Sequence, residues 1–177
     1  GNMKISKMIE SLSVLMNAAM DRKRRHVVPL KEELQYVEAY LHIMKERLGN
    51  KLTVDLEIGE DTLNEKVPRL ILQPVIENAI EHGVIRSGSG TVVLRSYKKG
   101  DYLYLETENN GIMSGQERAK VDRLLAPDYD TSKESSGNLG IANVNQRLGI
   151  LMENPADCPF SRKNDDRICA RLTIFVV

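Results

Sequence analysis

Residues 72–83, LQPVIENAIEHG, place polar side chains that can do chemistry inside a segment that is otherwise apolar. Glu77 and Glu81 are four residues apart, as are Asn78 and His82, and residues at this spacing share a helix face. Mg²⁺ needs only one or two protein oxygens when phosphates and waters supply the rest, so an amide oxygen on Asn78 suits that role. On spacing alone, the solvent-facing edge of an ordinary amphipathic helix is the favoured interpretation.

Two later stretches change this balance. ENNGIMSG (108–115) directly follows a predicted strand, where α/β folds often place polar groups that contact ligands. SSGNLGIANVNQRL (135–148) is a loop containing glycine that leads into a predicted helix, and the free N–H groups at a helix start favour phosphate. Each pattern is common by itself, but the three in this order are much more specific together.

The composition excludes some classes of partner. The 177 residues fit one compact domain with a helical appendage, and 25 basic residues balance 25 acidic ones. This balance gives no global reason to expect nucleic acid or an anionic membrane as partner. The basic run at 21–29 is interpreted as a solvated linker, because no aromatic residues interleave its charges. Cys158 and Cys169 lack metal-ligand spacing and fit reduced thiols in a cytoplasmic protein.

Hydrophobic periodicity predicts the elements that must position these side chains. Helices are expected at 3–20, 30–48, 70–82, 114–125 and 140–152, and strands at 52–58, at 90–109 as a pair with a tight turn at 99–101, and at 168–177. Adjacent strands joined by a tight turn are antiparallel, so we expect a mixed sheet. The predicted fold class is α/β, a two-layer sandwich with helices on one face of the sheet, plus an N-terminal helix.

Three segments carry a resemblance to a known family: PLKEELQYVEAYLHIMKERLGNKLTVDLEI, VPRLILQPVIENAIEHG and GIANVNQRL. Over nearly its whole length, the chain resembles the C-terminal part of YesM/LytS-type sensor histidine kinases, which have the GHKL (Bergerat-type) ATP-binding fold. The resemblance implies that residues 1–25 are a remnant of a dimerisation helical hairpin and linker. It implies that residues 26–177 are the ATP-binding catalytic domain.

The implied activity is transfer of the ATP γ-phosphoryl group to a histidine outside this fragment, because the family's N-P-H-F-style acceptor motif is not found in it. Asn78 would bind the Mg²⁺ that bridges the phosphates, Glu77 would act as or position the base, and His82 would lie near the phosphates. Gly83 would let the chain turn out of the helix. The remaining implied nucleotide-binding residues are Asn109, Gly111, Gly140, Ile141 and Asn143, and residues 126–139 would form the ATP lid.

The resemblance also implies ATP and Mg²⁺ as cofactors and a response regulator as the partner that receives the phosphate. The parent protein would form a homodimer through its upstream helical hairpin. Nucleic acid is not expected as a partner. The chain would be a cytoplasmic domain of a membrane-bound parent protein.

The sequence departs from the family pattern at several positions. Asn109 replaces the aspartate that reads adenine, and loss of a charge-assisted hydrogen bond costs about 1–3 kcal/mol. Met113 and Asn138 replace glycines, and Glu81 stands where the family often has lysine. Two interpretations stay open. We favour an active kinase with a tolerant pocket over a degenerate domain that binds nucleotide weakly and serves as a scaffold or regulator.

Two further alternatives share the fold: an ATPase of the gyrase type and a serine kinase of the anti-sigma type. The N-terminal helix and the segment EELQYVEAYLHIMKERL (32–48) favour the sensor kinase over both.

Overall fold

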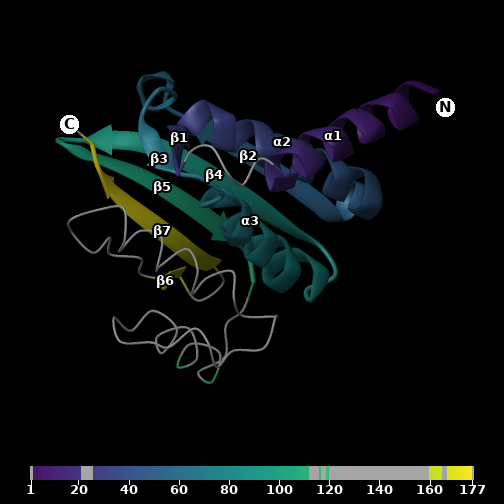
Figure 1. Ribbon diagram of the computed structural model, residues 1–177. Coiled ribbons are helices and arrows are strands. Elements are labelled where there is room, and N and C mark those ends of the chain that lie inside the picture. Colours follow the sequence, from purple (N-terminus) through teal and green to yellow (C-terminus); the bar gives the residue numbers. More distant parts are fainter. Residues whose placement is uncertain are drawn as a thin grey trace.

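The computed structural model describes residues 2–20, 26–111, 160–164 and 167–176, together with the single residues 116 and 119. The predicted helices at 114–125 and 140–152 and the predicted lid at 126–139 therefore lie outside the described residues, apart from those two positions. Figure 1 shows the arrangement of the described elements.

The three predicted helices in the described part are confirmed. They are α1 (Asn2–Met20), α2 (Leu30–Leu48) and α3 (Leu72–Ile80), and α3 continues into a π-helical turn, η3 (Glu81–Ile85). The predicted stop after α2 is also confirmed, because Gly49 caps that helix with a φ of 57°, a conformation that favours glycine. Short 3₁₀ turns, η1 (Gly49–Lys51) and η2 (Glu60–Thr62), flank the first long strand.

A five-stranded sheet forms the second layer, in the order β2-β4-β5-β7-β6. Its strands are β2 (Leu52–Ile58), β4 (Gly90–Lys99), β5 (Tyr102–Asn109), β6 (Phe160–Asn164) and β7 (Arg167–Phe175). β2 runs parallel to β4, while the other neighbours are antiparallel, so the expected mixed sheet is confirmed. The predicted hairpin turn is confirmed as well: Lys99 pairs with Tyr102, and Gly100 has a φ of 60°.

Three short strands were not predicted. β1 (Val27–Pro29) pairs with β3 (Lys66–Pro68) in a separate two-stranded sheet, and β6 pairs with β7 at the edge of the main sheet. β1 and β3 have three residues each and β6 has five, with an irregularity between Arg162 and Asn164. Such short segments show too few alternations for a period of two to be recognised.

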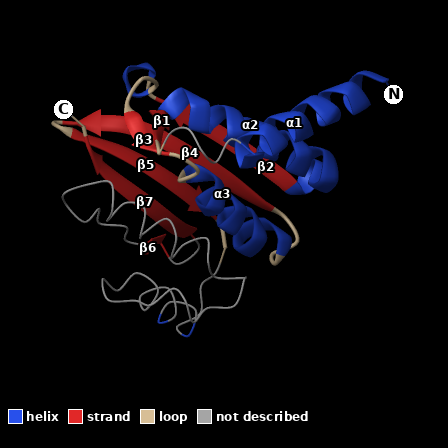
Figure 2. Cartoon of the chain, viewed as in Figure 1, coloured by secondary structure: helices blue, strands red, loops and turns tan. Residues whose placement is uncertain are grey.

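Helices cover one face of the sheet, which confirms the two-layer sandwich (Figure 2). α2 and α3 pack on the sheet, and alternate residues of its strands point toward them. The fully buried side chains of this core include Leu30, Ile71, Leu72, Ile76, Ile80, Leu94, Leu103, Leu105, Leu172 and Ile174. Leu, Ile and Val thus fill the core, as a chain without Trp requires.

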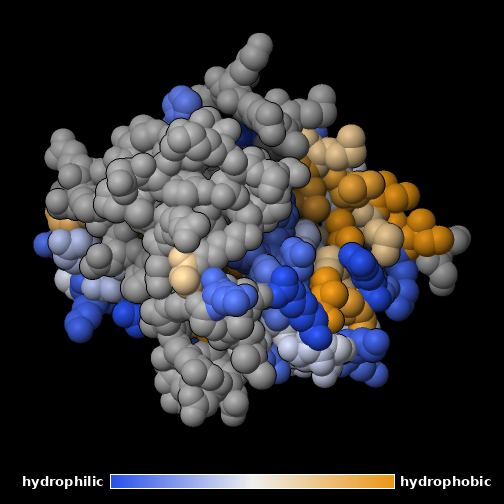
Figure 3. All heavy atoms as spheres, turned by 90° about the horizontal axis from the view of Figure 1, so that it is seen from below, coloured by the Kyte–Doolittle hydropathy of each residue, from blue (hydrophilic) through white to orange (hydrophobic). Residues whose placement is uncertain are grey.

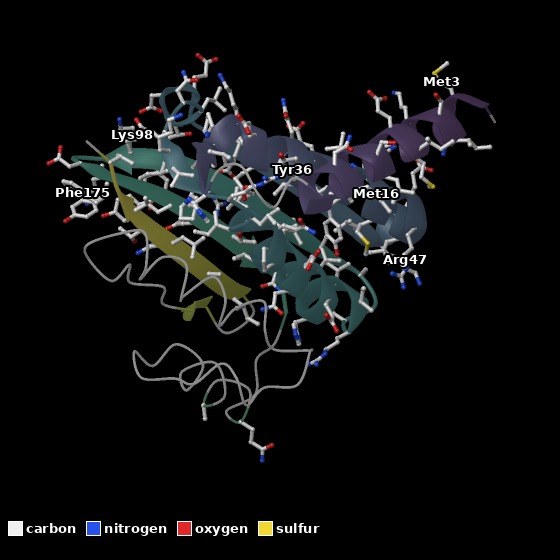
Figure 4. The ribbon with its side chains drawn as sticks, viewed as in Figure 1. Met3, Met16, Tyr36, Arg47, Lys98 and Phe175 are labelled. Carbon is white, nitrogen blue, oxygen red and sulfur yellow. The ribbon has the colours of Figure 1, made fainter. Side chains whose placement is uncertain are left out.

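α1 packs along α2 but leaves an apolar surface exposed. Lys4 of α1 forms an ion pair with Glu46 of α2 at 3.3 Å. Figure 3 shows a hydrophobic patch on this side of the molecule, and Met3 projects from the free end of the helix in Figure 4. Its members on α1 are 40–73 % exposed: Met3, Ile5, Met8, Ile9, Leu12 and Met16. None of the helices in the described ranges is both long and apolar enough to cross a membrane.

Candidate functional site

Helix α3 has the two faces that the sequence predicts. Its apolar residues Leu72, Val75, Ile76, Ala79 and Ile80 are buried in the core. The polar side chains lie toward the surface: Glu77, Asn78 and His82 are partly exposed, and Glu81 is exposed. The polar cluster is therefore presented by a helix whose opposite face is fixed by packing.

The start of α3 is held by a carboxylate from another helix. Glu33 of α2, 1 % exposed, accepts hydrogen bonds from the main-chain N–H groups of Leu70, Ile71 and Leu72, at 2.7, 2.9 and 3.3 Å. The helix begins at Leu72 rather than at residue 70, because Leu70 has a φ of 56° and so leaves the right-handed helical region. The sequence alone did not predict a role for Glu33.

The end of α3 differs from the expectation for Gly83. The chain does not leave the helix at this glycine but continues through the π-helical turn η3, where the N–H of Arg86 donates to the carbonyl of Glu81 at 3.3 Å. Gly83 is buried, and a Cβ there would overlap the side-chain amide of Asn109, at 2.7 Å from its Cγ. The glycine therefore permits close packing of the helix on β5; its role as the exit from the helix was wrongly predicted.

The end of β5 packs directly against this part of the helix. Asn109 is 5 % exposed, and its Nδ2 donates a hydrogen bond to the main-chain carbonyl of Ala79 at 3.2 Å. A Cβ on Gly111 would lie 2.9 Å from the Cα of Gly83 and 3.0 Å from the carbonyl oxygen of His82. Two stretches predicted to share a site, 72–83 and 108–111, are thus in contact.

Asn110, which lies in the predicted ligand-contacting stretch 108–115, adds a second link. Its Oδ1 accepts a hydrogen bond from the main-chain N–H of Thr91 at 2.8 Å. A Cβ on Gly90 would overlap that oxygen and would lie 2.9 Å from the carbonyl oxygen of Gly83. The start of β4, the end of β5 and the turn η3 therefore meet with no room for extra side-chain atoms.

Two neighbouring side chains, Gln73 and Tyr40, interact with the carboxylates of α3. Gln73 donates from Nε2 to Glu77 Oε1 at 2.8 Å, and the spacing of four residues places both on the same helix face. Burial and, after it, the negative charges of Glu77 and Glu81 together raise the pKa of Tyr40 on α2 to about 12. The polar side of α3 is thus negatively charged close to Tyr40.

The donor set fits a Mg²⁺ ion that is held mostly by a substrate. Within the described residues there is no group of three or more His, Cys, Asp or Glu side chains that could hold a metal. A partly exposed amide oxygen such as that of Asn78 suits Mg²⁺ only where phosphates and waters complete its six ligands. The residues present fit this arrangement and do not fit a metal cage built from protein alone.

Of the predicted site residues, the structure places Glu77, Asn78, His82, Asn109 and Gly111, and brings the helix that carries the first three onto the strand end that carries the last two. The other members lie outside the described residues. They are Gly140, Ile141 and Asn143, and the two departures from the family pattern at Met113 and Asn138 lie outside the described residues as well.

Comparison with known sequences connects the chain to kinases. The histidine kinase family model matches residues 1–52. The protein YwpD of Bacillus subtilis is 37 % identical over 120 residues, and the sensor histidine kinase BtsS of Escherichia coli is 33 % identical over 106 residues. The sensor protein LytS of Oceanobacillus iheyensis is 28 % identical over 142 residues. These matches cover 67 %, 59 % and 80 % of this chain, but only 40 %, 19 % and 24 % of the relatives.

Solved structures show the same fold. The catalytic domain of the histidine kinase ThkA has a TM-score of 0.64 at 14 % identity, covering 84 % of this chain and 95 % of that domain. The histidine kinase AdeS of Acinetobacter baumannii has a TM-score of 0.59 at 17 % identity, covering 95 % of this chain and 76 % of that structure. The expected fold of GHKL-type catalytic domains is confirmed.

Proposed function

Because this chain resembles sensor histidine kinases in sequence and has the fold of their catalytic domains, we propose that it binds ATP and transfers the γ-phosphoryl group to a histidine outside this fragment. The observation that carries the proposal is the contact between the turn after α3 and the end of β5. Gly83, Asn109 and Gly111 meet there without room for a Cβ on either glycine.

Close packing of this kind supports the proposal because phosphoryl transfer depends mainly on positioning and charge stabilisation. The helix that presents Glu77 and Asn78 is fixed on the sheet, at the strand end where Asn109 and Gly111 lie. Asn109 and Gly111 would contact the adenine ring of ATP, and the polar face of α3 would contact its phosphates. Because the amide NH₂ of Asn109 donates to the carbonyl of Ala79, its Oδ1 is the atom that would accept a hydrogen bond from the adenine amino group.

Each polar residue of α3 has a role in this proposal. Glu77, oriented by Gln73, would accept the proton of the attacking imidazole or position it. Asn78 would hold Mg²⁺ through its amide oxygen, and the ion, when bound, would neutralise the charge of the phosphates. His82 would lie near the phosphates. Glu81 is exposed, so its carboxylate has room to point away from them.

The proposal extends to the parent protein. Residues 1–25 would be part of the helical hairpin through which the parent dimerises, and residues 26–177 would be the catalytic domain. The exposed apolar residues of α1 support this, because a helix of this kind needs a partner to bury them. The phosphate would pass to a response regulator, and the chain would be a cytoplasmic domain of a membrane-bound parent.

Calorimetric titration of ATP into the chain, with and without Mg²⁺, tests the proposal. We expect Mg-ATP to bind, and ATP without Mg²⁺ to bind more weakly. Asn78→Ala should remove that Mg²⁺ dependence. Asn50→Ala, which changes an exposed asparagine in the turn η1, is the matched control and should leave it unchanged.

Two outcomes contradict parts of this proposal. If millimolar nucleotide gives no heat with the folded chain, the active kinase is rejected for this domain, and the degenerate scaffold is the better explanation. If Asn78→Ala binds with unchanged Mg²⁺ dependence, the role given to Asn78 is wrong.

A further inference from the structure

Glu33 is a buried acidic residue that the proposed reaction does not use. Its side chain is 1 % exposed, although a carboxylate is costly to bury without partners. Both oxygens accept from main chain: Oε1 from Leu70, and Oε2 from Ile71 and Leu72. Since both oxygens are occupied in this way, Glu33 serves the chain itself.

The three N–H groups belong to the start of α3, where a helix has donors without partners inside the helix. A side chain from the helix's own N-cap usually accepts one of them. Ile71 stands at the N-cap of α3 and has no oxygen to offer. The left-handed conformation of Leu70 turns consecutive N–H groups toward Glu33, so that a single carboxylate on α2 replaces the local cap.

The start of α3, which Glu33 holds, is close along the helix to Glu77, the proposed catalytic residue. Leu72, whose N–H it binds, is followed by Gln73, and Gln73 donates to Glu77 one turn further along α3. The same helix α2 carries Tyr40, whose pKa responds to the charges of Glu77 and Glu81. α2 therefore contacts α3 at its start and beside its carboxylates.

We propose that Glu33 is a positioning residue: by holding the first N–H groups of α3, it sets where that helix presents Glu77 and Asn78 to Mg²⁺ and ATP. This inference rests on the proposed function. The expected consequence of losing Glu33 is a helix that remains packed through its apolar face but presents Asn78 out of place.

The test compares Glu33→Gln and Glu33→Asp with the unchanged chain, at a temperature where circular dichroism shows all of them folded. Glutamine keeps the size but replaces one acceptor oxygen with an NH₂ group that faces N–H donors. Aspartate keeps the charge but is one methylene shorter. The measured quantity is the ratio of the Kd for ATP without Mg²⁺ to the Kd with Mg²⁺.

We expect Glu33→Gln to lower this ratio by roughly 10-fold or more, as when a residue supporting a metal ligand is lost. Glu33→Asp should lower it less. The control is Ser96→Ala, which removes a buried 2.7 Å hydrogen bond to Thr62. β4 begins at Gly90, which is near the proposed site, and ends at Lys99. Ser96 is near the far end of this strand, two residues before Lys98, which is labelled in Figure 4. This control should lose stability with the ratio unchanged.

The outcomes separate the two proposals. If the unchanged chain binds no nucleotide, the proposed function fails and this inference fails with it. If the unchanged chain shows Mg²⁺-dependent binding and the ratio is the same in both Glu33 variants, only the inference is overturned, and Glu33 is then a stabilising residue like Ser96. If Glu33→Gln does not fold, Glu33→Asp decides by the same criterion.

Discussion

The two ends of α3 are held in opposite ways. At its start, one charged side chain reaches across from α2, and the carboxylate of Glu33 accepts three main-chain N–H groups. At its end, two glycines make the contact: Gly83 and Gly111 pack against each other, and Gly83 also packs against the side chain of Asn109, whose Nδ2 donates a hydrogen bond to the carbonyl of Ala79. The start of α3 therefore depends on a charged carboxylate, and its end depends on two residues that have no Cβ atom.

This difference has a physical consequence. A buried carboxylate with good hydrogen-bond geometry is sensitive to protonation and to small changes in length. A contact between two glycines is insensitive to pH but tolerates no added volume, because well-packed interiors have no space to receive it. The two ends of the same helix should therefore fail under different changes, and each change is a test of the comparison.

The largest effect is expected from Gly83→Ala. The new Cβ would lie 2.7 Å from Cγ of Asn109 and still closer to its amide nitrogen, so helix and strand must separate. We expect a loss of about 3 kcal/mol in the free energy of unfolding, at the upper end of the usual cost of overpacking. Chemical denaturation followed by circular dichroism measures it.

Gly88→Ala is the matched control. Gly88 has a φ of 81° and open space around the position of a Cβ, so only backbone strain of about 1 kcal/mol is expected there. Equal losses in the two variants would show that the glycine contact is not tight, and the comparison between the two ends of α3 would fail.

A smaller effect is expected from Asn109→Asp. An aspartate restores the residue type that the family uses for adenine, but it cannot donate to the carbonyl of Ala79 and would place an oxygen against it. We expect the free energy of unfolding to fall by about 1–3 kcal/mol, the cost of an unmade buried hydrogen bond. Thermal unfolding at neutral pH measures it.

The neighbouring residue supplies the control. Asn110 accepts through Oδ1 from the N–H of Thr91, and an aspartate keeps that acceptor. Asn110→Asp should therefore cost less than about 1 kcal/mol. If the two substitutions cost the same, the donor role of Asn109 is wrong. The amide at 109 is then explained by sequence drift and not by its contact with the helix.

The sequence pointed to the residues at one of the two ends, but not to how they pack. Glycines and asparagines at 83, 109 and 111 stand out locally, and a resemblance to a family can be recognised from them. Their physical role was harder to predict, since the exclusion of a Cβ depends on strand β5, which is distant in sequence. Gly83 was accordingly predicted to end a helix that in fact continues as a π-helical turn.

The other end was missed because Glu33 lies in an ordinary charged segment, KEELQ. The signal that would have found it is its register. The buried residues of α2 include Leu30, Leu34, Val37, Leu41 and Met44, and Glu33 falls on the same stripe. A carboxylate on an apolar stripe requires a buried partner, but the partner is main chain 38 residues away, which no periodicity reveals.

The smallest expected effect is a pH dependence of the free energy of unfolding, which should come from the start of α3 and not from its end. Burial raises the pKa of Glu33 above its ordinary value of 4.5, while the N–H groups of Leu70, Leu72 and Ile71 and the charge of Arg69 act in the opposite direction. A carboxyl group with a raised pKa in the folded state contributes stability below 4.5, which is lost as pH rises through the raised value. Gly83, Gly111 and Asn109 do not titrate, so the packing among these three residues should contribute no such dependence.

Denaturation of the unchanged chain and of Glu33→Gln from about pH 4 to about pH 7 measures this contribution. The free energy of unfolding of the unchanged chain should decline relative to the variant as pH rises over this range. Asn110→Asp, which retains Glu33, is the control. At pH values where its new carboxyl group is already ionised, its free energy of unfolding should change with pH as that of the unchanged chain does. A difference that grows with pH would mean that the three N–H groups outweigh burial. The start of α3 would then be held by a carboxylate whose pKa is lowered, and its anchor would weaken in acid instead.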